Sequence, residues 1–194
     1  RLLFVLPSIT NYFTFLEDLA NELISRGNEV HLATSRQHIA RIDSYRRSIE
    51  CTVHHIDFPR ALSPFKHISA ARQVDKLVSE LEPDLINIHF SAALFTTMLG
   101  KKSNWPRSIG TIHGLGSPLI SGWRKYAVSR AEKWSAERAN EIFVLTDDDK
   151  EYLSEKAAKA NVSKLNSFGM GCDIDRFDPN SISTENKRKL RSDY

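Results

Sequence analysis

Short, almost continuously apolar runs recur along the 194-residue chain and alternate with amphipathic stretches. Runs rich in Val, Ile, Leu and Phe are typical of β-strands that are covered on both faces of a sheet. The pattern predicts these strands: Leu2–Leu6, Glu29–Thr34, Cys51–Ile56, Asp84–His89, Ser108–His113, Glu141–Thr146 and, with a weaker signal, Val162–Phe168.

Helical periodicity fills the intervals between the strands. Gly27 and Pro83 follow two of the amphipathic stretches, and both residue types commonly end helices. Repeated strand–helix–strand units predict an α/β fold, with a mainly parallel sheet between two layers of helices. The expected helices cover 13–24, 68–81, 92–101 and 123–139, and a further helix starts at Thr146.

Composition excludes several classes of protein. The 41% hydrophobic and 26% charged content is that of a globular domain, and the net charge of +3 is small and dispersed, which disfavours nucleic acid as a partner. It is compatible with weak attraction to anionic lipid or phosphorylated ligands. Two cysteines without metal-site spacing, and no apolar run of about 18 residues, favour a reduced cytoplasmic setting without a membrane span.

His89 and His113 each end a predicted strand, and parallel sheets bind ligands at the carboxyl ends of their strands. A single histidine is usually structural, but two at equivalent strand ends favour a binding or catalytic role. The other histidines we interpret as structural or solvated: His31, His38, His54, His55 and His67.

Two loops at the same edge carry polar groups. The first contains Ser8, Thr10 and Asn11 but no glycine, so it is neither a dinucleotide fingerprint nor a P-loop. Its side chains either contact a phosphate or sugar, or simply cap the following helix. The second loop offers Arg60 and Lys66, which either clamp a pyrophosphate or are ordinary solvated charges.

Other chemistry is poorly supported. Glu132 lies among basic residues of a predicted helix and is interpreted as a member of an i,i+4 ion pair. No Ser–His–Asp order, nucleophile elbow, HExxH or paired zinc signature is present, so neither a covalent hydrolase nor a metal or other cofactor is expected.

The segment KLNSFGMGCDIDRFDP, Lys164–Pro179, resembles the hinge region of glycosyltransferase family 4 through Gly169, Gly171, Asp173 and Phe177. Upstream, RGNEVHLATS, TIHGLG and AEKWSAERANEIFVLTDDDKEYL are similar to successive segments of that family, in the same order. The stretch from HHIDFPRALSPFKH to DLINIH is similar to the capsular-polysaccharide and lipid-linked-oligosaccharide subgroup, although Asn87 stands where this subgroup often has another histidine.

The resemblance implies one half of a GT-B fold. Residues 1–180 would form the N-terminal, acceptor-side Rossmann-like domain, and 181–194 would begin the interdomain linker. The C-terminal, donor-binding domain would be absent from this chain, which we expect to be an excised piece because it lacks an initiator Met and ends abruptly. Family 4 enzymes retain anomeric configuration and need no bound metal.

The same resemblance assigns roles to residues of this chain. His113 would be the catalytic residue that contacts the donor sugar near the reacting carbon. The donor-binding residues would be Ser8, Thr10, Asn11, Gly114 and Gly116, and the acceptor-binding residues would be His89, Arg60 and Lys66.

The leading hypothesis is therefore the acceptor-side domain of a retaining hexosyltransferase type of enzyme. It would move a sugar from a nucleotide-sugar, UDP-linked by family habit, to a lipid-linked saccharide in cell-surface polysaccharide synthesis. Its partners would be donor, acceptor, its own C-terminal domain and, peripherally, the cytoplasmic face of the membrane. Two alternatives stay open: half of a UDP-sugar 2-epimerase, and a non-catalytic module that binds a sugar phosphate or a partner protein.

Overall fold

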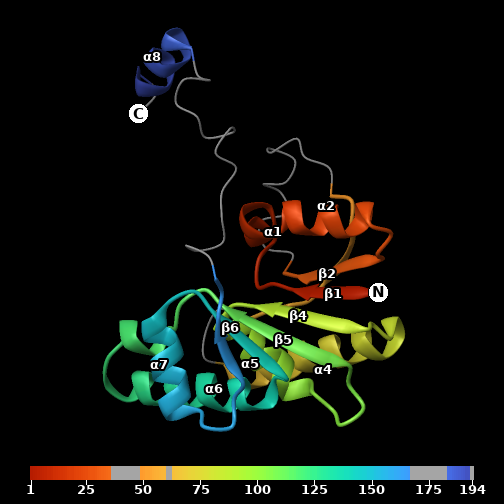
Figure 1. The fold of residues 1–194 in the computed structure, drawn as a ribbon, viewed down its shortest axis with the longest axis vertical. Helices are drawn as coiled ribbons and strands as arrows, with labels where there is room; N and C mark the ends of the chain where they lie inside the picture. The colour runs from red at the N-terminus through yellow and green to blue at the C-terminus, as the bar shows by residue number, and fades with distance from the viewer. Residues whose placement is uncertain (36–48, 60–62, 167–182, 193–194) are drawn as a thin grey trace.

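The computed structural model describes residues 1–35, 49–59, 63–166 and 183–192. Within these ranges the strands form one seven-stranded, all-parallel sheet in the order β3-β2-β1-β4-β5-β6-β7 (Figure 1), which confirms the predicted α/β architecture. The strands are β1 (Leu2–Val5), β2 (Val30–Thr34), β3 (Thr52–His55), β4 (Leu85–His89), β5 (Arg107–Ile112), β6 (Glu141–Val144) and β7 (Val162–Lys164).

Helices cover both faces of the sheet. Figure 1 shows α1 and α2 on one face and α4, α5 and α6 on the other. The described helices are α1 (Ile9–Phe15), α2 (Glu17–Ser25), α4 (Pro64–Leu81), α5 (Ser91–Gly100), η1 (Ser117–Leu119), α6 (Gly122–Arg138), α7 (Asp147–Lys156) and α8 (Thr184–Ser192).

Each face of the sheet has its own hydrophobic core, and strand β1 contributes to both. Leu3 and Val5 point into the core formed with α4 and α5, whereas Phe4 and Leu6 point into the core formed with α1 and α2. Successive side chains of a strand point to opposite faces, so a strand buried on both sides needs an unbroken apolar run. This is why the apolar runs located the strands correctly.

The single helix predicted over 13–24 is wrong, because the chain breaks at Leu16 into α1 and α2. Leu16 leaves the helical conformation, with φ −129° and ψ −8°, and its side chain is buried in the core. The break turns Leu19 outward, to 45% exposure, although the periodicity placed it on the buried face. The helix end predicted at Gly27 is confirmed by a left-handed φ of +84° there.

Some predictions lie outside the described residues. They include most of the hinge-like segment Lys164–Pro179, with Gly169 and Gly171, and also His38, Arg60 and Cys172. Among the described residues, no helix is long and apolar enough to cross a bilayer.

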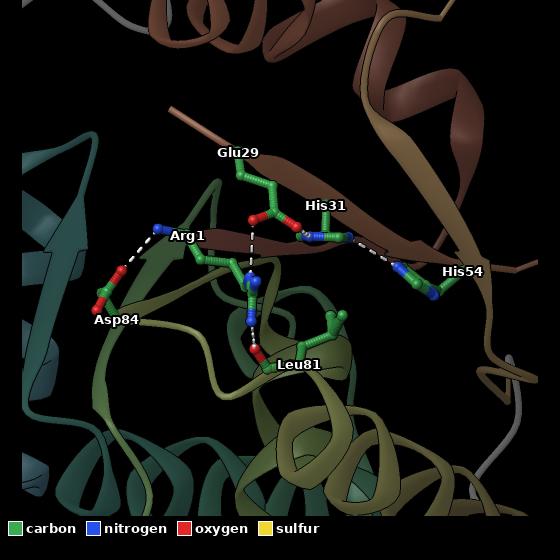
Figure 2. Close-up of polar contacts among 6 residues, drawn as sticks. All are labelled: Arg1, Glu29, His31, His54, Leu81 and Asp84. Carbon is green, nitrogen blue, oxygen red and sulfur yellow. Dashed lines mark hydrogen bonds and ion pairs between the residues drawn. The ribbon is translucent and has the colours of Figure 1, made fainter. Parts of the chain in front are cut away.

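A polar network joins residues at the amino ends of β1, β2 and β4 and reaches β3 through His54 (Figure 2). Glu29 bridges the Arg1 guanidinium, at 2.9 Å, and the Nε2 of His31, at 2.8 Å. The Nδ1 of His31 lies 3.0 Å from the Nε2 of His54. His31 and His54 therefore link β2 to β3, as expected of structural histidines.

Close contact between α4 and α5 depends on the absence of a side chain at Gly100. A Cβ there would lie 2.6 Å from the backbone oxygen of Ala71. We therefore expect Gly100→Ala to lower the free energy of unfolding by about 1–3 kcal/mol, although alanine is the better helix former. Urea denaturation of this chain tests it, with Ser154→Ala on the exposed side of α7 as the control, expected to change by less than about 0.5 kcal/mol. Equal stability of Gly100→Ala and the parent would contradict the close contact.

Candidate functional site

His89 and His113, each predicted at the carboxyl end of a strand, lie there and contact each other. Strand β4 pairs with β5 in a register that sets His89 opposite Thr111, so both histidines lie at the carboxyl edge. The Nδ1 of His89 is 3.0 Å from the Nε2 of His113. One ring nitrogen must donate and the other accept, so the two imidazoles share a single proton in this contact.

Burial keeps both imidazoles neutral. His89 is 2% exposed, and desolvation, followed by the nearby His113, lowers its pKa to about 3. Desolvation also lowers the pKa of His113 to about 4. Neither ring carries a charge at neutral pH, because an imidazolium would lose its hydration without gaining a counter-ion. The Nε2 of His89 is buried without a hydrogen-bond partner in the described part of the chain.

Aromatic rings fix the plane of His113. Phe90 stacks on it with ring centres 4.2 Å apart and planes 12° apart, and Phe15 of α1 lies 4.9 Å away. Phe90 adopts a φ of +73°, which is strained for a bulky side chain. Its amide donates to the Thr111 carbonyl at 2.9 Å, which fastens this backbone to β5. Phe90 and Phe15 gave no signal in the sequence beyond their apolar character.

The turn after His113 is anchored by a carboxylate that the sequence interpretation misplaced. Gly114 has a φ of +128°, a conformation that residues with a side chain rarely adopt, and it turns the chain sharply. The Gly116 amide then donates to Oε1 of Glu132 at 2.7 Å. Glu132 is 2% exposed, so the predicted surface ion pair is wrong. The buried small residues Ser135 and Ala136, one turn further along α6, share its face and were the available clue.

The first loop joins the same edge, because β1 pairs with β4. Ser8 occupies the N-cap position of α1 but makes no side-chain cap. Its hydroxyl lies 2.8 Å from the Thr10 hydroxyl, and its carbonyl accepts from the Asn11 amide at 3.1 Å. The alternative of a simple side-chain cap is therefore not what the loop shows, and the half-buried hydroxyls of Ser8 and Thr10 are paired with each other.

Lys66, the described one of the two predicted basic residues, lies away from the histidine pair. Lys66 is exposed in the first turn of α4, and within the described residues no contact joins it to His89 or His113. His67, beside it, is buried with Nδ1 2.8 Å from the Thr96 hydroxyl, which confirms a structural role. In the same ranges, no group of His, Cys, Asp or Glu converges to hold a metal ion.

An apolar pocket of about 560 Å³ opens beside the turn, between α4, α5 and α6. Its wall includes Ser91, Gly116 and Glu132, so it adjoins the segments that follow both histidines. The Ser91 hydroxyl and Oε2 of Glu132 are buried without a partner in the described part of the chain. The edge therefore offers hydrogen-bonding groups next to an apolar pocket, an arrangement typical of small-molecule sites.

The sequence matches the family described as glycosyl transferase 4-like domain over residues 14–163. No curated protein matches it significantly.

Solved structures share its fold. UDP-N-acetylglucosamine 2-epimerase from Rickettsia bellii aligns with a TM-score of 0.70 and 13% identity, over 98% of this chain and 50% of that one. HepE from Anabaena, in complex with UDP-glucose, aligns with a TM-score of 0.66 and 15% identity, over 99% of this chain and 49% of that one. Sucrose-phosphate synthase from Thermosynechococcus elongatus aligns with a TM-score of 0.61 and 12% identity, over 84% of this chain and 47% of that one. The chain thus spans about half the length of these three.

The histidine pair makes stability depend on pH. A histidine whose folded pKa is lowered binds more protons when unfolded, so its contribution is complete above the unfolded pKa of about 6.5 and is lost as the pH falls toward the folded value. Between about pH 7 and pH 4.5, the parent should lose roughly 2 kcal/mol more unfolding free energy than His89→Gln, which cannot titrate. Denaturant titrations at both pH values measure this difference, and parallel losses in the two proteins would refute the buried neutral state.

Glu132 should matter through its acceptor oxygen. Glu132→Ala leaves the Gly116 amide unpaired and should cost about 1–3 kcal/mol of unfolding free energy. Glu132→Gln keeps an amide oxygen and should cost clearly less. Thermal and urea unfolding of both variants test this order, and equal losses would show that the hydrogen bond to Gly116 is unimportant.

Proposed function

This chain belongs to the glycosyl transferase 4-like domain family, and from that premise we propose that it is the acceptor-side domain of a retaining hexosyltransferase. The enzyme would transfer a sugar from a UDP-linked donor to a lipid-linked saccharide, in cell-surface polysaccharide synthesis at the cytoplasmic face of the membrane. The observation that carries the proposal is the neutral His89–His113 pair at the carboxyl ends of β4 and β5.

The chemistry of the pair suits a glycosyl donor. Positive charge develops on the sugar ring as its bond to the diphosphate breaks, and a cationic imidazole beside it would oppose that charge. A neutral His113 avoids this repulsion and still offers a ring nitrogen to a sugar hydroxyl. Phe90 and Phe15 hold its ring in place before the donor arrives, which lowers the cost of ordering it.

Of the surrounding residues, some would contact the donor and others the acceptor. Ser8, Thr10 and Asn11 would face the diphosphate, and the Gly114 and Gly116 turn would allow the donor to approach the backbone. On the acceptor side, Lys66, Arg60 and the buried His89 would adjoin the saccharide. A UDP-linked donor is supported by HepE, whose structure holds UDP-glucose on the same fold.

A second, donor-binding domain is part of the proposal. Negative charge grows on the leaving diphosphate, and cationic groups must stabilise it. The described residues around the histidine pair supply hydroxyls and neutral rings. We therefore expect the 194-residue piece to fold but to show no turnover, with the diphosphate contacts made by the second domain.

The epimerase alternative is less well supported, although the fold is shared. An epimerase must remove a proton from a carbon atom and return it on the opposite face. Bases with pKa values of about 3 and 4 are too weak for that step at neutral pH. Incubating the complete protein with UDP-glucose or UDP-N-acetylglucosamine, without acceptor, tests this directly through the configuration at C2.

The test of the proposed function is His113→Ala in the complete polypeptide. With UDP-glucose as the probe donor and a short-chain, lipid-diphosphate-linked saccharide as acceptor, kcat/KM should fall at least about 100-fold, because one preorganised contact to the reacting sugar is lost. His113→Gln keeps an amide donor and should retain more activity.

His55→Gln is the matched control, because His55 is exposed on β3 and separated from β4 by two strands. It should change kcat/KM less than about twofold. Full activity of His113→Ala, with its fold verified by thermal unfolding, would remove His113 from the reaction. No turnover by the parent with any UDP-sugar would favour a binding module.

A further inference from the structure

Four large apolar side chains stand out into solvent where α4 begins and where η1 leads into α6. Phe65 is 85% exposed, Leu119 86%, and Trp123 and Tyr126 each 72%. A single exposed apolar residue needs no explanation, but several together mark an interaction surface. These four residues are therefore candidates for an interaction surface.

Basic residues lie near these four apolar residues in the sequence, and acidic residues do not. Lys66, Arg124 and Lys125 are exposed, and the Arg124 guanidinium lies 5.8 Å from the centre of the Trp123 ring. The sequence contains no Asp or Glu in 58–74 or in 113–131. Where the structure describes the chain, no carboxylate forms an ion pair with any of these three cations. The surface is apolar and positively charged at once.

The two segments border the same hollow. The apolar pocket is lined by Pro64 and Ile68 of α4 and by Ala127 and Val128 of α6, and Phe65 and Tyr126 are adjacent in the sequence to lining residues. Helices α4, α5 and α6 lie together on one face of the sheet (Figure 1). We call the four apolar residues and three cations, with the pocket between them, the aromatic–cationic face.

We propose that the aromatic–cationic face docks onto an anionic lipid bilayer. Trp123, Tyr126, Phe65 and Leu119 would enter the headgroup boundary, the cations would meet lipid phosphates, and the pocket would accept a hydrocarbon chain. Trp and Tyr beside Lys and Arg are typical of membrane interfaces, whereas lysine is depleted at protein–protein interfaces. The segments 58–74 and 113–131 contain no acidic residue that an anionic surface would repel, and Glu132 of the pocket wall is 2% exposed, which complements this charge.

The inference rests on the proposed function in one respect: a lipid-linked acceptor is presented at a membrane surface. The pocket wall contains Ser91 and Gly116, which follow His89 and His113. A lipid seated there would hold its head near the histidine pair. Membrane docking and delivery of the acceptor would then use one continuous surface.

Vesicle sedimentation of the complete polypeptide tests the docking. Vesicles of phosphatidylcholine with about 30% phosphatidylglycerol should bind the protein at least roughly tenfold more strongly than phosphatidylcholine alone, and salt should weaken the binding. Equal binding to both vesicles, or none to either, would overturn the proposal.

Variants assign the binding to this face. The double substitution Arg124→Gln with Lys125→Gln should weaken binding to anionic vesicles about fivefold per charge removed. Trp123→Ser with Tyr126→Ser should weaken it by roughly tenfold or more. The matched controls are Leu19→Ser, on exposed α2, and Lys76→Gln, on exposed α4, which should bind as the parent does. Variants and controls that bind alike would overturn the assignment.

Activity on a water-soluble, short-chain acceptor separates this proposal from the proposed function. The Trp123 and Tyr126 variant should keep that activity and lose vesicle binding. If the parent transfers sugar to the water-soluble acceptor but does not bind vesicles, the docking proposal fails and the proposed function stands. If the parent binds vesicles but transfers no sugar, the proposed function fails and the docking proposal stands. If the Trp123 and Tyr126 variant instead loosens the association of the two halves of the polypeptide, in limited proteolysis, a protein surface covers the face and the bilayer proposal fails.

Discussion

The hydrogen bond between His89 and His113 depends on the register of two parallel strands. Because β4 pairs with β5 so that His89 lies opposite Thr111, two imidazoles meet at the carboxyl edge with ring nitrogens 3.0 Å apart. Burial then decides their charge, since desolvation lowers both pKa values to about 3 and 4. The strand register thus places two neutral hydrogen-bonding groups at the edge where parallel sheets bind ligands.

The parts around the pair serve to hold it in place. Phe90, in a strained backbone conformation, stacks on His113, and Phe15 of α1 packs against the same ring. Glu132 reaches from α6 to fasten the amide of Gly116, which fixes the turn that follows His113. Aromatic side chains thus hold the His113 ring, and a carboxylate of α6 holds the turn that follows it.

The sequence predicted the fold well, because each buried strand is a near-continuous apolar run, and the placing of His89 beside His113 follows from strand order. It failed where tertiary packing decides. The break at Leu16 has no glycine or proline to announce it, and Glu132 has the composition of a surface residue although it is buried. Glu132 accepts a hydrogen bond from the amide of Gly116, sixteen residues earlier in the chain. That contact depends on how α6 packs, which helical periodicity alone does not show.

The most direct measurement is the ring-nitrogen chemical shifts of the histidines, followed by ¹⁵N NMR from about pH 7.5 to pH 4.5. The account predicts two imidazoles, assigned through His89→Gln and His113→Gln, that stay neutral down to about pH 5 and show a hydrogen bond between rings. Addition of UDP-glucose to the complete polypeptide should shift the signals of His113. Titration of both rings near the ordinary pKa of about 6.5, with no response to UDP-glucose, would contradict the account.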